Sequence, residues 1–92
     1  MADASETIEI VNRKGLHARA SAKFVNMCAM LPDGLAVKVI KDGNEAAGAS
    51  ILGLMMLGAA KGDTIAIAVS GDGAEAALEQ LAAMVKDGFG ED

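Results

Sequence analysis

The sequence predicts an α+β domain in which helices pack on one face of a mainly antiparallel sheet, and three observations carry this prediction. Apolar and polar residues alternate over 7–11 and 64–70, which is typical of strands with one buried face. Apolar residues recur at helical spacing over 18–31 and 74–86. An Asp42-Gly43 turn favours a β-hairpin in the middle of the chain, between residues 35–40 and 45–49. The expected order of elements is β-α-β-β-α-β-α, which is typical of two packed layers.

The length and composition predict one domain. A chain of 92 residues is long enough for a modest core, so we expect a single domain over 1–92 with flexible ends at 1–5 and 89–92. The apolar fraction is 52%, but the chain has two Phe and no Tyr or Trp. Its core must therefore be built largely from Ala, Val, Ile, Leu and Met.

The first half of the chain is expected to contain a strand, a long helix and a hairpin. A strand over 7–11 precedes a helix that runs from 18 to 30 or 31 and is ended by Pro32. A strand over 35–40 then turns back into a strand over 45–49. The composition of that returning strand disfavours β structure, so only the hairpin turn supports it.

The second half is expected to contain a short helix, a strand and a long helix. Ser50 is a candidate N-cap for a helix from 51 to 57 or 58. The strand over 64–70 precedes a helix over 74–86, with Gly88 as its expected C-cap. Sequence pattern alone leaves the strand order open, because a ferredoxin-like fold has the same element order through its fourth strand.

Composition also argues against several function classes. The net charge is −5 and stacking aromatics are nearly absent, which disfavours nucleic-acid binding. Cys28 is the single cysteine, so no intramolecular disulfide can form, and one Cys with one His disfavours a zinc site. We expect no metal or cofactor. The apolar run over 51–60 is too short to span a bilayer, and residues 1–6 lack the features of a signal peptide. A cytoplasmic location is therefore expected.

The single histidine, His17, lies where the first strand has ended and the long helix begins. The chain turns there at Gly15, and a helix N-terminus carries unsatisfied N–H groups that attract anions. No Asp or Glu occurs between Ile10 and Pro32, although the whole chain is acidic. That segment holds half of the eight basic residues, namely Arg13, Lys14, Arg19 and Lys23.

These features predict a site that holds a phosphoryl group. Neutral His17 would attack phosphorus as a nucleophile. The backbone N–H groups around Ala18 and Arg19 would meet the phosphoryl oxygens. The Arg19 guanidinium would add charge-assisted hydrogen bonds, each contributing roughly 1.5–3 kcal/mol. The residues alone leave open which ring nitrogen of His17 reacts.

Two separated motifs resemble one known family. The segment 15–25, with Gly-Leu-His-Ala-Arg-Ala at its start, resembles the active-site signature of the histidine-containing phosphocarrier (HPr) family. The segment 50–57, followed by Lys61-Gly62-Asp63, is similar to that family's regulatory-serine region. The resemblance covers nearly the whole chain. The family's usual proline after the arginine is Ala20 here, and the asparagine three residues before the histidine is Lys14.

The resemblance implies a fold and a function. The fold would be an open-faced β-sandwich, a four-stranded antiparallel sheet with three helices on one face. The protein would be a phosphoryl carrier of the bacterial phosphotransferase system and not an enzyme, with Enzyme I as donor and IIA components as acceptors. His17 would be phosphorylated on Nδ1, and Arg19 would stabilise the phosphate. Ser50 would match the serine that an HPr kinase/phosphorylase modifies.

The short helix is expected to carry a docking surface. Its apolar side chains are too many for one face of a two-turn helix, so some must be exposed. Ile51, Leu52 and Met55 are the candidate contacts for successive partners, whereas Leu54 and Leu57 are expected to face inward. Such handovers suit small, transient interfaces on a monomer.

Other interpretations remain open from the sequence. The same carrier chemistry could serve a regulatory, nitrogen-type phosphotransferase branch instead of sugar uptake. A small phosphatase is disfavoured because no second acid, base or metal ligand is visible near His17. His17 could also be only a pH-sensitive contact of a binding module, and Ser50 could be only a helix cap.

Overall fold

The computed structural model describes residues 3–91, which form four strands, three α-helices and one short 3₁₀ turn. The elements in chain order are β1 (Asp3–Glu9), α1 (Ala18–Ala29), β2 (Ala36–Lys41), β3 (Asn44–Ala47), α2 (Ile51–Met56), β4 (Thr64–Ser70), α3 (Ala74–Lys86) and η1 (Gly88–Gly90). The predicted β-α-β-β-α-β-α order is confirmed. None of the helices in this part of the chain is long and apolar enough to cross a membrane.

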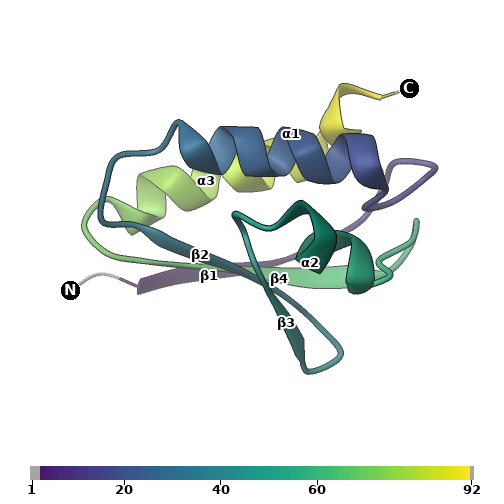
Figure 1. Cartoon of the computed structure of the whole chain (residues 1–92), viewed down its shortest axis with the longest axis horizontal. Helices are drawn as coiled ribbons and strands as arrows, with labels where there is room; N and C mark the ends of the chain where they lie inside the picture. The colour runs from purple at the N-terminus through teal and green to yellow at the C-terminus, as the bar shows by residue number, and fades with distance from the viewer. Residues whose placement is uncertain (1–2, 92) are drawn as a thin grey trace.

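The four strands form one antiparallel sheet in the order β1-β4-β2-β3 (Figure 1). β4 pairs with β1 from Asp3↔Ser70 to Glu9↔Thr64, and its other edge pairs with β2. The hairpin of β2 and β3 completes the sheet. The predicted four-stranded sheet is therefore confirmed, and the ferredoxin-like alternative is excluded because β4, not β1, lies inside the sheet.

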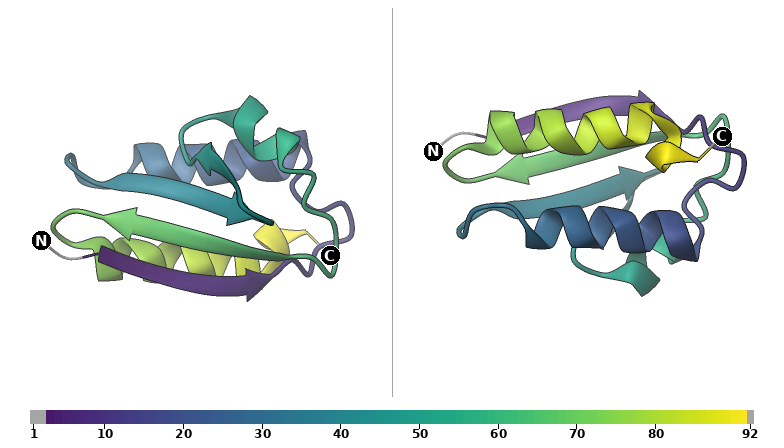
Figure 2. Two further views of the ribbon diagram at one scale, coloured as in Figure 1. Left: turned by 90° about the horizontal axis from the view of Figure 1, so that it is seen from below. Right: turned by 90° about the horizontal axis from the view of Figure 1, so that it is seen from above.

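Helices α1 and α3 lie side by side on one face of this sheet, and the other face is left open (Figure 2). Alternate residues of β4, namely Ile65, Ile67 and Val69, are at most 1% exposed beneath them. Phe24 of α1 and Leu81 of α3 meet these side chains in the core. Helix α2 packs against α1 and β3. The structure is thus the open-faced α+β sandwich that the family resemblance implied.

The first strand begins earlier than its sequence pattern indicated. We expected a strand over 7–11, whereas β1 spans Asp3–Glu9, and Val11 lies outside it with 44% of its surface exposed. Pairing with the full length of β4 recruits residues 3–6, of which only Ala4 is apolar, so they lack the alternation used to predict a strand. Tertiary pairing, and not local pattern, sets this boundary.

The two ends that we expected to be flexible carry regular structure where they are described. Residues 3–5 belong to β1, and Phe89 of η1 is only 2% exposed. Residues 1, 2 and 92 lie outside the described part of the chain. The short segment after α3 turns toward the N-terminal end of α1, which lies at the same end of the molecule (Figure 2), and this brings Glu91 into contact with His17.

Candidate functional site

The loop before α1 is fixed by backbone hydrogen bonds to a second loop. The N–H of Leu16 donates to the carbonyl of Ala59 at 2.9 Å, and the side chain of Leu16 is buried. Gly15 has φ +62°, and a Cβ atom there would lie 2.2 Å from the Ala59 oxygen. Only glycine fits this close approach, which explains the glycine two residues before the histidine.

His17 is the N-cap residue of α1. Its backbone is extended, with φ −76° and ψ −178°, and its Nδ1 accepts a hydrogen bond of 3.3 Å from the Arg19 N–H. The side chain is 24% exposed, so the ring is neither buried nor free in solvent. The predicted position of the imidazole at a helix start is therefore present, among N–H groups that have no partner inside the helix.

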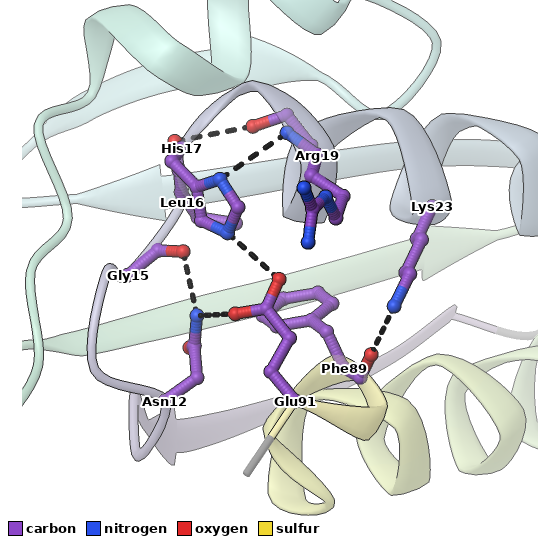
Figure 3. Close-up of polar contacts among 9 residues, drawn as sticks. Asn12, Gly15, Leu16, His17, Arg19, Lys23, Phe89 and Glu91 are labelled. Atoms are coloured by element: carbon purple, nitrogen blue, oxygen red, sulfur yellow. Dashed lines mark hydrogen bonds and ion pairs between the residues drawn. The ribbon is translucent and has the colours of Figure 1, made fainter.

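The other ring nitrogen of His17 faces an acid. Nε2 lies 2.8 Å from Oε2 of Glu91 (Figure 3). Because Nδ1 accepts from Arg19, the ring proton belongs on Nε2, where it is donated to the carboxylate. This arrangement leaves a lone pair on Nδ1, which points to the positive end of the α1 dipole.

Glu91 is held in place by Asn12, a polar residue that is only 1% exposed. The Asn12 amide donates to Oε1 of Glu91 at 3.1 Å and to the Gly15 carbonyl at 2.8 Å. Desolvation acts to raise the pKa of Glu91. The hydrogen bonds from His17 and Asn12, and the charges of His17 and Lys23, act against it, and the pKa lies below its ordinary value.

The imidazole opens into a surface cavity of about 250 Å³ that is lined by three basic residues, the histidine and one acid: Arg13, Lys14, Arg19, His17 and Glu91. Arg19 is exposed, and Figure 3 shows its side chain extending beside the His17 ring. The cavity is therefore small, open and predominantly cationic. It suits a doubly charged group such as phosphoryl more than an extended organic ligand.

The predicted cap role of Ser50 is confirmed. Its Oγ accepts a hydrogen bond of 2.9 Å from the Gly53 N–H at the start of α2. On the same helix Ile51, Leu52 and Met55 are 41%, 68% and 40% exposed, whereas Leu54 is fully buried as expected.

Met56 is 77% exposed and completes an apolar surface with the three predicted residues. We call Ile51, Leu52, Met55 and Met56 the α2 patch. The sequence pattern did not single out Met56, because a two-turn helix gives too few residues to define its buried stripe sharply.

Sequence reasoning missed Glu91, the polar partner of His17, and Asn12, which holds Glu91. The expectation that no second acid lies near His17 is wrong, because Glu91 is in direct contact with its ring. Asn12 and Glu91 are 79 positions apart, and neither belongs to a repeating pattern. No local signal could have brought them together, since only the packing of the segment after α3 against the α1 loop does so.

The remaining candidates for a reactive group, the Cys28 thiol and a metal-binding cluster, do not provide a second site in the described part of the chain. Burial raises the pKa of the Cys28 thiol to about 11, so Cys28 is a poor nucleophile near neutral pH. Within residues 3–91, no group of three or more His, Cys, Asp or Glu side chains could hold a metal ion.

Comparisons with known proteins agree with this geometry. The family described as "PTS HPr component phosphorylation site" matches residues 4–87. The phosphocarrier protein HPr of Neisseria meningitidis serogroup A is 41% identical over 86 residues, which are 94% of each chain. The phosphocarrier protein NPr of Escherichia coli K12 is 36% identical over 90 residues, with 95% of this chain and 96% of NPr covered.

The fold comparison gives the same result. The crystal structure of HPr-C-His from Thermoanaerobacter tengcongensis has a TM-score of 0.89 and 35% identity, and covers 97% of this chain and 98% of its own. Fold and site together define a small phosphoryl carrier with a histidine at a helix start. The chain belongs to the HPr family of phosphocarriers of the phosphotransferase system.

Proposed function

We propose that Nδ1 of His17 accepts a phosphoryl group from Enzyme I and then gives it to a IIA component. The observation that carries this proposal is the pair of ring contacts, with Nε2 against the Glu91 carboxylate and Nδ1 accepting from the Arg19 N–H at the start of α1. The lone pair forms the new N–P bond while the bond between phosphorus and the donor breaks, and that electron pair leaves with the donor.

The surroundings of Nδ1 supply positioning and charge, which are the main requirements of phosphoryl transfer. Once Nδ1 is bonded to phosphorus it no longer accepts from the Arg19 N–H, which can then donate, together with the Ala18 N–H, to the phosphoryl oxygens. The Arg19 guanidinium borders the same cavity and can add charge-assisted hydrogen bonds. The group remains in an open cavity, from which an acceptor protein can remove it.

A carrier is favoured over a phosphatase by the position of Glu91. A phosphatase needs a base that activates water on the phosphorus side of the ring. Glu91 is the acid that borders the cavity, and its carboxylate is engaged by Nε2 and by Asn12. The carboxylate therefore contacts Nε2 and not Nδ1, the atom proposed to accept the phosphoryl group.

The α2 patch is the proposed docking surface for Enzyme I and IIA. Its four apolar side chains are 40% to 77% exposed, and methionine side chains adapt to more than one partner. Ser50 caps this same helix, so phosphorylation by an HPr kinase/phosphorylase would place a doubly negative group beside the patch. We propose that this charge repels an acidic partner surface.

A regulatory, nitrogen-type branch is the second candidate function. The NPr relative aligns over nearly the whole chain with an identity close to that of the HPr relatives. The chemistry at His17 would be the same in both branches, and only the partner proteins would differ. Rates of phosphorylation by the Enzyme I of each branch, measured on this protein, would distinguish the two candidates.

The test of the carrier function is direct phosphorylation of the protein. Incubation with Enzyme I and phosphoenolpyruvate should add the mass of one phosphoryl group, which is lost again in acid. Since His17 is the single histidine, His17→Ala should take up none while it keeps the fold. Uptake by His17→Ala, or an acid-stable product on the wild type, would contradict the assignment.

A further inference from the structure

We infer that Glu91 is a positioning residue for the phosphoryl-accepting histidine. It fixes the ring proton on Nε2 and acts as the counter-ion of the positively charged ring that forms when Nδ1 is phosphorylated. This inference rests on the proposed function of His17. The segment after α3 would thus supply the negative charge beside His17 that the loop before α1 does not contain.

The contact geometry supports this role. Oε2 of Glu91 is 2.8 Å from Nε2, and the Glu91 side chain is 17% exposed. Nδ1 and Nε2 are on different edges of the imidazole ring, so the carboxylate stays out of the path of the incoming phosphoryl group. It can therefore remain in contact with Nε2 before and after transfer.

The charge balance of the step gives the carboxylate its effect. Attack by Nδ1 uses the ring lone pair, and the proton stays on Nε2, so a neutral imidazole becomes a cation. The bond from phosphorus to its donor breaks, and the electron pair departs with the donor. A carboxylate against Nε2–H stabilises the cation without taking the proton, as the buried aspartate does for the imidazole of a Ser-His-Asp triad.

Glu91 is anchored by contacts from several elements. Phe89 has φ +59°, a left-handed conformation that is unfavourable for an aromatic residue, yet its side chain is buried. The Lys23 ammonium of α1 donates to the Phe89 carbonyl at 2.7 Å, and Asn12 donates to Oε1 of Glu91. Backbone strain retained by surrounding contacts is typical of functional sites. Together these contacts hold the Glu91 carboxylate against the imidazole ring of His17 (Figure 3).

The test uses Glu91→Gln and a small chemical donor. Glutamine keeps the size of the side chain and an acceptor for Nε2–H but removes the charge. Glu79→Gln, an exposed position on α3, is the matched control with the same change in net charge. Phosphoramidate phosphorylates histidine without a protein partner and releases ammonia, so its reaction with His17 is independent of docking.

We expect Glu91→Gln to react with phosphoramidate about tenfold more slowly than the wild type, because a charge-assisted hydrogen bond becomes a neutral one. Glu79→Gln should react at the wild-type rate. Nitrogen NMR of the single histidine should place the proton on Nε2 in the wild type and the phosphate on Nδ1 after reaction.

Equal rates for wild type and Glu91→Gln would overturn the inference, as would a ring proton on Nδ1 or a phosphate on Nε2. These outcomes are separate from a failure of the proposed function. If Enzyme I does not phosphorylate the wild type, the phosphoramidate and NMR measurements still decide the role of Glu91.

Discussion

The two ring nitrogens of His17 lie in different surroundings, and this difference determines what the residue can do. Nε2 lies against a carboxylate, whereas Nδ1 accepts from a backbone N–H, and the residue borders an open, mainly cationic cavity. A lone surface histidine would exchange its proton between the two nitrogens. Here these two contacts favour the tautomer with its proton on Nε2, and under the proposed function Nδ1 is then the nucleophile before any donor arrives.

Arg19 offers the sharpest residue-scale prediction. Arg19→Ala should slow phosphorylation of His17 by Enzyme I by about 10- to 100-fold, because roughly 1.5–3 kcal/mol of charge-assisted hydrogen bonding to the phosphoryl group is lost. The side chain is exposed, so the melting temperature should stay close to that of the wild type. Rapid-quench kinetics would measure the effect.

Arg19→Lys is the control for charge alone. Lysine keeps the positive charge but loses the planar fork that binds two oxygens, so its rate should lie between those of the wild type and Arg19→Ala. A wild-type rate for Arg19→Ala would remove this side chain from the site.

Among the elements, α2 combines a structural and a proposed functional role at one residue. Ser50→Ala should lower the free energy of unfolding by about 1 kcal/mol, because the Gly53 N–H loses its cap. Ser50→Asp should preserve most of this stability, since aspartate is also a good N-cap, but should weaken docking to Enzyme I. Urea unfolding and titration calorimetry would measure the two effects separately.

The comparison of these two variants separates the roles of Ser50. Weaker docking by Ser50→Asp at unchanged stability would support regulation by negative charge at this position. If Ser50→Asp binds Enzyme I with wild-type affinity, Ser50 acts only as the cap of α2.

The elements also show where sequence reasoning succeeds. β4 and α3 were predicted with the bounds that the structure has, because each has a complete local pattern and clear breakers on both sides. His17 was placed correctly at a helix start for the same reason. β1 was misplaced because its start depends on a partner strand, and Glu91 was missed because its contact with His17 spans 74 positions.

At the scale of the whole molecule, the free energy of unfolding should depend on pH through the ionisation of Glu91. Its pKa is lowered in the folded state, so below the ordinary value of 4.5 the unfolded chain binds more protons at this group than the folded one. The stability that this carboxylate contributes is therefore present above that value and is lost as the pH falls through the lower, folded-state pKa.

Urea unfolding of wild type and Glu91→Gln tests this dependence. Between neutral pH and a pH well below 4.5, the wild type should lose more stability than Glu91→Gln, because the variant has no group there to titrate. Glu79→Gln serves as the control and should behave as the wild type does. An identical loss in all three proteins would show that the Glu91 contacts do not favour the ionised form.

The strand order has a consequence for how the protein acquires its activity. β1 and β2 each pair with β4 and not with one another, and the loop before His17 is tied by hydrogen bonds to residues 59–63. A nascent polypeptide that has reached only α2 thus lacks the strand that joins its sheet. Its histidine loop also lacks its hydrogen-bond partners among residues 59–63. The ability to accept a phosphoryl group should consequently appear only on cooperative folding of the whole domain. Partly folded chains would then not take phosphoryl groups from the donor protein.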